Sequence, residues 1–172
     1  MLKMTIEDWR CRVIRQFDSN LFSAVLINGS KKTKEITNFE YCLVPEKIRN
    51  LINPPVPEEQ IERDFVIKRS LDMYYNYLSK DLNTRQGAFV NNYDNKDNHC
   101  ISYFHCYVRD EKFCMNVYVR SMDFIRNFVF DCQTFNLAYS NVFDKIKLQY
   151  GEKVDNGYIR VFVFSLHIYE QQ

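Results

Sequence analysis

Apolar positions recur at helical spacing in three stretches of the chain. The first covers 5–17 and opens with Thr-Ile-Glu-Asp, which has the form of a capping box. The second covers 58–82. The third covers 131–150, includes Leu137 in its apolar pattern, and is followed by Gly151, a residue favoured just after a helix. We expect a helix in each of the three stretches.

Alternating or continuous apolar runs predict the strands of a sheet. The clearest pair, 101–108 and 113–120, is separated by four polar residues, which indicates a hairpin. Further strands are expected at 157–169, 22–28, 36–44 and 87–90. All four prolines lie within 45–57, which predicts a connection there. Strands that come in pairs with helices between them predict an α+β fold with a mixed sheet.

Composition narrows the class of protein. A chain of 172 residues suits a single domain, so 1–172 is expected to form one unit. The net charge of +1 gives no electrostatic case for a nucleic-acid partner or an acidic membrane. No apolar run is long enough for a transmembrane helix. The six cysteines include no CxxC pair, so we expect reduced thiols in the cytoplasm and no bound metal.

Two short motifs in the second half carry candidate chemistry. Cys100 stands where a polar loop enters a strand, a place where sites are often built. From the residue type alone, the alternative of one more half-buried thiol is favoured, because most unpaired cysteines are small core residues. The second motif follows a strand and consists of Arg120, Ser121 and Asp123. The Arg120 guanidinium can donate two parallel hydrogen bonds and the Ser121 hydroxyl can donate one, which suits a phosphate ester. Asp123 adds a carboxylate. The alternative for this motif is an ordinary strand-end turn with a local ion pair.

A third motif completes a recognisable order. His167 and Tyr169 alternate on the last predicted strand, so they share one face, either for a ligand or for hydrogen bonds within the core. Together the three motifs resemble the thymidylate synthase family, which includes the deoxycytidylate hydroxymethylases. In that family a nucleophilic Cys opens a strand, Arg-Ser-x-Asp lies twenty residues later, and His-x-Tyr closes the site. Cys100 and Arg120 have that separation here, and the resemblance covers about 83–169.

The resemblance implies a covalent mechanism with 5,10-methylenetetrahydrofolate as cofactor. Cys100, as a thiolate, would attack C6 of a pyrimidine base and make C5 nucleophilic. Arg120 and Ser121 would bind the 5′-phosphate, and His167 and Tyr169 would bind the deoxyribose 3′-hydroxyl. The family fold implied is a mixed sheet with flanking helices, paired through the sheet with a second copy in a homodimer.

Further positions correspond to ligand contacts of the family. Asp123 would sit near the pterin of the folate. Arg85 matches the first of two adjacent arginines that reach across the dimer to the partner's phosphate, and Gln86 stands in place of the second. Lys31 and Lys32 lie near the place of another phosphate-binding basic residue. These matches imply a phosphate site to which both copies contribute.

Asp131 stands where the family reads the base. Thymidylate synthases have Asn in a Phe-Asn pair there, whereas this chain has Phe130-Asp131, the exchange that marks the deoxycytidylate hydroxymethylases. An Asn amide can serve N3–H and O4 of uracil, whereas Asp can accept a hydrogen bond from the exocyclic amine of cytosine. The resemblance therefore favours dCMP over dUMP. The alternative is that Asp131 only caps the helix that begins there.

The chain also departs from the family pattern around these motifs. His99 and Ile101 flank Cys100, where the family has Pro and His. The Gly-Asp pair that usually precedes the His-x-Tyr segment is Phe164-Ser165 here. Both departures fall beside residues to which the resemblance assigns a role.

Two further departures concern the early and late parts of the chain. The family's early catalytic Glu has no firm counterpart, with Glu40 and Glu58 as candidates. The chain stops at Gln172, three residues after Tyr169, without the segment that covers the folate in the family. Exposure of the one-carbon unit to water would favour a hydroxymethyl product over a methyl product.

These expectations converge on a folate-dependent C5 hydroxymethyltransferase with dCMP as the favoured substrate. If the protein is an enzyme of this family, the alternative is a thymidylate synthase or hydroxymethylase that acts on dUMP. Gln86, the changed neighbours of Cys100 and the missing segment favour another class, a catalytically impaired nucleotide-binding or interaction protein. The Asn-, Lys-, Tyr- and Phe-rich composition suggests a phage or other viral source, and hence the host cytoplasm as location.

Overall fold

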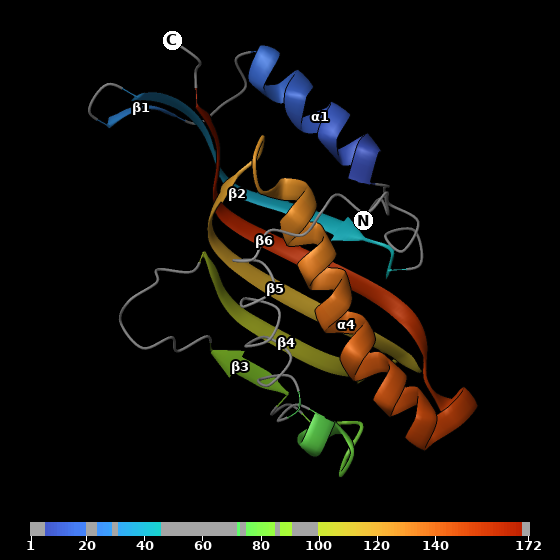
Figure 1. Cartoon of the computed structure of the whole chain (residues 1–172). Coiled ribbons are helices and arrows are strands. Elements are labelled where there is room, and N and C mark those ends of the chain that lie inside the picture. Colours follow the sequence, from blue (N-terminus) through green and yellow to red (C-terminus); the bar gives the residue numbers. More distant parts are fainter. Residues whose placement is uncertain are drawn as a thin grey trace.

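Six strands form one mixed sheet in the order β1-β2-β6-β5-β4-β3 (Figure 1). The computed structural model describes residues 6–19, 24–28, 31–45, 72, 75–84, 87–90 and 100–169. Its strands are β1 (Ala24–Asn28), β2 (Lys31–Leu43), β3 (Ala88–Val90), β4 (Ile101–Arg109), β5 (Lys112–Asp123) and β6 (Asp155–Tyr169). β5 and β6 are parallel and the other four pairs are antiparallel. The predicted α+β class with a mixed sheet is confirmed.

The helices are α1 (Ile6–Asp18), α4 (Phe128–Tyr150) and the short 3₁₀ helix η1 (Gly151–Lys153). α4 begins three residues before the predicted start at 131, because the apolar run Phe-Val-Phe forms its first turn. Leu137 is 46% exposed, so its predicted place in the apolar face is wrong. The buried stripe runs through Phe135, Ala138 and Val142, and Leu137 lies to one side of it. Of the helix expected over 58–82, the described residues 72 and 75–78 are helical.

The predicted hairpin between β4 and β5 is confirmed. Arg109 pairs with Lys112, and the two residues between them, Asp110 and Glu111, have φ of 50° and 61°. Positive φ at both turn positions gives the twist that a two-residue hairpin needs. β2 begins at Lys31, earlier than the predicted 36, because its polar start pairs with β1 from Lys31 and also with β6 from Thr33. Such backbone pairing is not visible in hydrophobic periodicity.

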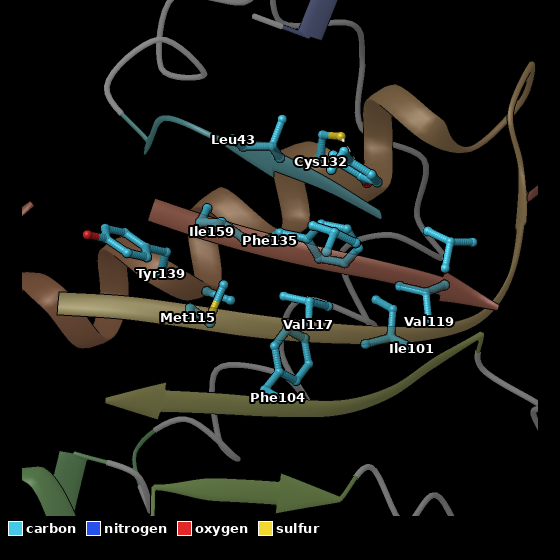
Figure 2. Packing of buried hydrophobic residues seen from close by; sticks show 14 of the residues in the cluster. Leu43, Ile101, Phe104, Met115, Val117, Val119, Cys132, Phe135, Tyr139 and Ile159 are labelled. Atoms are coloured by element: carbon cyan, nitrogen blue, oxygen red, sulfur yellow. Dashed lines mark hydrogen bonds between the residues drawn. The ribbon is translucent and has the colours of Figure 1, made fainter. Parts of the chain in front are cut away.

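One face of the sheet, here called the core face, is covered by α1 and α4. A row of buried side chains crosses four neighbouring strands in register: Phe104, Val117, Val161 and Tyr41, each at most 1% exposed. Figure 2 shows Phe135 of α4 above this row, and its ring lies 6.5 Å from that of Phe104. The burial of large apolar side chains on this face is the main source of stability.

α1 adds to the same face through Trp9. Its ring lies 5.8 Å from that of Phe39 and 5.9 Å from that of Tyr41, and its Nε1–H donates to the Cys42 carbonyl at 3.2 Å. A buried indole N–H needs such a partner, so the bond fixes the helix over β2.

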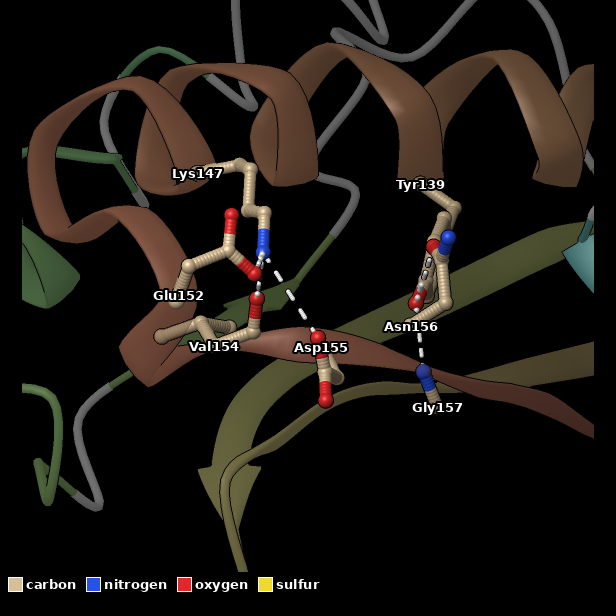
Figure 3. A network of polar contacts seen from close by, with 7 residues as sticks. All are labelled: Tyr139, Lys147, Glu152, Val154, Asp155, Asn156 and Gly157. Atoms are coloured by element: carbon tan, nitrogen blue, oxygen red, sulfur yellow. Dashed lines mark hydrogen bonds and ion pairs between the residues drawn. The ribbon is translucent and has the colours of Figure 1, made fainter.

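The C-terminal half of α4 is tied to the start of β6 by polar contacts (Figure 3). The Tyr139 hydroxyl donates to the Phe113 carbonyl at 2.9 Å and accepts the Gly157 N–H at 3.0 Å. A side chain at Gly157 would place its Cβ 2.3 Å from the Phe113 oxygen, so only glycine permits this approach. Lys147 donates to the Val154 carbonyl at 3.0 Å. These contacts set the position of α4 along the sheet.

The opposite face, here called the outer face, is formed by alternate residues that include Tyr103, Tyr118, Arg160, Phe162 and Phe164. Tyr118 and Phe162 stack with ring centroids 4.7 Å apart and planes 9° apart. Arg160 Nε donates to Glu40 Oε1 at 2.6 Å. The packing contacts of α1 and α4 lie on the core face, so neither helix covers this surface. Among the helices of the described residues, none is long and apolar enough to span a bilayer.

Candidate functional site

Cys100 and Arg120 lie side by side at one end of the sheet. β4 and β5 pair Ile101 with Val119, and one step further Cys100 stands opposite Arg120. The Arg120 N–H donates to the Cys100 carbonyl at 2.7 Å. Cys100 is half-buried and Arg120 is exposed. The structure thus brings the predicted nucleophile and the predicted phosphate ligand together through adjacent strands.

Ser121, His167 and Tyr169 meet at the same end of the sheet. The parallel pairing of β5 and β6 sets Ser121 opposite Ser165. It brings the Ser121 hydroxyl within 3.5 Å of His167 Nδ1. The rings of His167 and Tyr169 are 5.2 Å apart at 81°. A hydroxyl, an imidazole and a phenol therefore follow one another beyond the Cys100–Arg120 pair, as the motifs predict.

Asp123 lies opposite His167 and closes a turn between β5 and α4. Its Oδ1 accepts the N–H groups of Ile125 at 3.0 Å and Arg126 at 3.1 Å, and Arg126 Nε lies 3.8 Å from Oδ2. The alternative of a strand-end turn with a local ion pair is therefore confirmed for this carboxylate. Its neighbours nonetheless place it at the site.

Arg126 is a site residue that the sequence analysis did not single out. Its side chain is 73% exposed, and its guanidinium lies 5.9 Å from the centroid of the Tyr169 ring. The resemblance points to no basic residue three positions after the aspartate. The sequence does contain a local signal for this pair, because an Arg three residues after an Asp can form an ion pair with it across a turn.

Asp131 is buried at 1% exposure in α4, one turn from its start. Its N–H donates to the carbonyl of Asn127, which is the N-cap, at 2.8 Å. The alternative that Asp131 caps the helix is therefore wrong. Nearby, the Tyr41 hydroxyl and the Cys132 thiol lie 3.6 Å apart. Burial, then Cys132, and last the charge of Asp131 raise the pKa of Tyr41.

Lys31 and Lys32 begin β2 at the same end of the sheet, since the next residue, Thr33, pairs with Tyr169. Arg85 and Gln86 lie outside the described residues, as does Glu58. The Glu40 candidate for the early catalytic residue is not brought to the site. It pairs with Phe162, five residues from His167 along β6, which corresponds to about 16 Å.

The side chains around Asp123 fit the chemistry of a folate. The carboxylate is an acceptor for the donor edge of a pterin. Ile125 and Tyr169 are 68% and 40% exposed and offer apolar surface for a flat ring. The Arg126 guanidinium, 73% exposed, could pair with the anionic end of such a cofactor. Within the described residues, no group of three or more His, Cys, Asp or Glu side chains could hold a metal ion.

A comparison with solved structures shows a thymidylate-synthase-like fold. The chain is similar in structure to the thermostable thymidylate synthase A from Bacillus subtilis, with a TM-score of 0.65 and 13% sequence identity. The match covers 96% of this chain and 80% of that chain. No protein-family model and no curated protein matches the sequence. At this identity the likeness shows the fold alone, and the roles of individual residues stay predictions.

Proposed function

We propose that this protein transfers a one-carbon unit to C5 of a pyrimidine nucleotide, and that it converts dCMP to its 5-hydroxymethyl derivative. One observation carries the proposal, the convergence at one end of a thymidylate-synthase-like sheet. There Arg120 donates its N–H to the Cys100 carbonyl at 2.7 Å, and the Ser121 hydroxyl lies 3.5 Å from His167. Nucleophile, phosphate donors and sugar ligand are the parts that such a transfer requires.

The roles follow from the chemistry of the side chains. The Cys100 thiolate forms a bond from Sγ to C6 of the base, which makes C5 nucleophilic, and leaves again when C5 loses its proton. The Arg120 guanidinium and the Ser121 hydroxyl bind the 5′-phosphate. His167 and Tyr169 orient the deoxyribose through its 3′-hydroxyl. Lys31, Lys32 and a neighbouring copy's counterpart of Arg85 complete the phosphate site.

Asp123 and Arg126 are the residues that would hold 5,10-methylenetetrahydrofolate. This cofactor supplies the one-carbon unit at the oxidation level of formaldehyde when it is bound. Asp123 is already fixed by two backbone N–H groups, so it presents its remaining acceptor capacity in one orientation. Arg126 offsets the charge of that carboxylate.

Asp131 is proposed to select cytosine. The residue is 1% exposed and lies in the first turn of α4, whose N-cap is Asn127. As an acceptor for the exocyclic amine, it favours cytosine, whereas O4 of uracil would face a second acceptor. A site built for one hydrogen-bond pattern discriminates strongly against the other.

The proposal includes the assembly of the protein. Residues 1–172 form one unit, and two copies pair through their sheets so that Arg85 of each serves the other's nucleotide. The aromatic outer face supports this, because the packing contacts of α1 and α4 lie on the opposite face.

The test is mass spectrometry of dCMP and dUMP after incubation with the protein and methylenetetrahydrofolate. A gain of CH₂O on dCMP is expected, lost in Cys100→Ser and retained in Cys11→Ser, a matched variant at an exposed cysteine of α1. Product from dUMP alone would overturn the role of Asp131, and a gain of CH₂ would overturn hydroxymethylation.

A second candidate function is nucleotide binding without turnover. It is favoured by Asp123, whose two oxygens are already engaged by the backbone of 125–126 and by Arg126. Calorimetric binding of dCMP with no product in the mass spectrum would establish this candidate in place of the first.

A further inference from the structure

The imidazole of His167 has two ring nitrogens, and one of them meets a hydroxyl of the neighbouring strand. The Ser121 hydroxyl lies 3.5 Å from Nδ1. Asp123, which stands opposite His167 in register, directs its carboxylate to the turn at 125–126 instead, where Oδ1 accepts two backbone N–H groups and Oδ2 lies 3.8 Å from Arg126 Nε. The contact with Ser121 thus leaves Nε2 as the nitrogen that can face a ligand.

The strand that carries His167 is held on both sides, which fixes the direction of the ring. β6 lies between β5 and β2 in the sheet (Figure 1), and His167 pairs with Asp123 on the one side and with Glu35 on the other. The ring is half-buried, and the Tyr169 ring lies 5.2 Å from it at 81°. A nitrogen on such a ring can be aimed at one position.

The hydrogens available at this contact allow one arrangement once a phosphate is bound. A serine hydroxyl has a single hydrogen, which Ser121 donates to the phosphate in the proposed function, so only its lone pairs remain for His167. Nδ1 must then carry the hydrogen and donate it to the Ser121 oxygen. A neutral imidazole has one N–H, and Nε2 is therefore an acceptor.

We propose that Ser121 has a second role as a positioning residue: it joins the phosphate site to the sugar site through His167, so that the 3′-hydroxyl of the nucleotide must donate its hydrogen to Nε2. The inference rests on the proposed function and links the roles that were assigned there separately. Donation to an anionic phosphate polarises the hydroxyl and makes its oxygen a better acceptor for Nδ1–H. A separation of 3.5 Å is long for a hydrogen bond, and such contacts shorten when a ligand binds.

The arrangement defines the class of ligand. It fits a nucleoside 5′-monophosphate with a free 3′-hydroxyl. A nucleotide within a DNA chain is excluded, because its 3′-oxygen is esterified and has no hydrogen to donate.

The first test compares the binding of dCMP with that of 2′,3′-dideoxy-CMP by calorimetry. The ratio of their dissociation constants measures what the 3′-hydroxyl contributes, and about 10-fold is expected in the native chain. Ser121→Ala should reduce this ratio to about 2-fold, because Nδ1 loses its acceptor, whereas Ser121→Thr keeps a hydroxyl and should retain the native ratio. Ser165→Ala is the matched control, since this half-buried serine is the partner of Ser121 in register on β6, and it should also retain the native ratio.

The outcomes separate this inference from the proposed function. A Ser121 that only binds phosphate would weaken both nucleotides equally, and an unchanged ratio in Ser121→Ala would overturn the link. An equal loss of the ratio in Ser165→Ala would overturn it too, since any serine removed there would then have the same effect. A native chain that binds neither nucleotide would overturn the proposed function itself.

The second test observes the hydrogen on the ring by ¹⁵N nuclear magnetic resonance of the chain labelled in its histidines and saturated with dCMP. The chain has three histidines, and His167→Gln identifies the signals of His167. Nδ1 is expected to carry the hydrogen and Nε2 to lack it in the native complex, with this preference lost in Ser121→Ala. A complex in which Nε2 carries the hydrogen would overturn the proposal.

Discussion

The two faces of the sheet follow different rules although they share the same strands. On the core face, Val117 and Val161 are fully buried beneath α4. On the outer face, Tyr118 and Phe162, their next neighbours in sequence, are only partly buried and stack on each other. Both faces carry aromatic residues, so the difference lies in burial: the core-face side chains Phe104 and Tyr41 are at most 1% exposed, whereas the stacked rings of the outer face keep contact with water. The difference separates a face whose side chains pack beneath α1 and α4 from a face that neither of these two helices covers.

The candidate site lies where the regular alternation of both faces ends. Ser121 and Asp123 continue β5 beyond the part that α4 covers with apolar side chains, and His167 does the same for β6. The central strands of the sheet thus hold polar groups at one end, while the core behind them stays apolar. This arrangement fixes functional side chains more firmly than a loop would.

The largest contrast between the faces should appear in stability. Phe135→Ala on α4, at a position with no exposure, should lower the free energy of unfolding by about 3–5 kcal/mol, since it leaves a cavity over Phe104. Phe162→Ala on the outer face should cost about 1 kcal/mol in a dilute monomer, because the ring is already in contact with water. Urea denaturation measures both. If Phe135→Ala and Phe162→Ala lowered the free energy of unfolding equally, the proposed difference between the two faces would be wrong.

The second largest loss of stability is expected where α4 packs against β5 and β6. Gly157→Ala should lower the free energy of unfolding by about 1–3 kcal/mol, because its Cβ would meet the Phe113 oxygen at 2.3 Å. Gly151→Ala is the matched control: its φ is 59°, but no atom lies within 4 Å of the added Cβ, so about 1 kcal/mol is expected. If the control proved the more harmful of the two, close packing would not be the cause.

The sequence could predict the elements whose signals are local. The hairpin turn at Asp110–Glu111 and the end of α4 just before Gly151 could both be predicted from residue type and spacing. The order of motifs also placed Cys100, Arg120 and His167 at one site. The polar start of β2 was not accessible, because its partners are distant in sequence. The Arg126–Asp123 pair is local but polar, so a hydrophobic pattern does not reveal it, and such a pattern does not reveal the left-handed Asn38 in the middle of β2 either.

The smallest effect is a pH dependence that arises on the outer face. Burial, and then the charge of Arg109, lower the pKa of His105 from its ordinary 6.5. The unfolded chain therefore binds a proton more readily, so the stabilising contribution is present above about pH 6.5 and is lost as the pH falls through the lowered pKa. His105→Gln should flatten this part of the curve of melting temperature against pH. An unchanged slope would assign the acid dependence to other groups.

The central claim is that Cys100 attacks C6 of a pyrimidine nucleotide. It is tested most directly with 5-fluoro-dCMP and methylenetetrahydrofolate, followed by peptide mass spectrometry. Because fluorine at C5 cannot leave as a proton does, the thiol cannot be expelled and the adduct accumulates. The account predicts the nucleotide attached to the peptide that contains Cys100, in the native chain and in Cys11→Ser, and absent from Cys100→Ser. No covalent adduct, or an adduct on another cysteine, would contradict it.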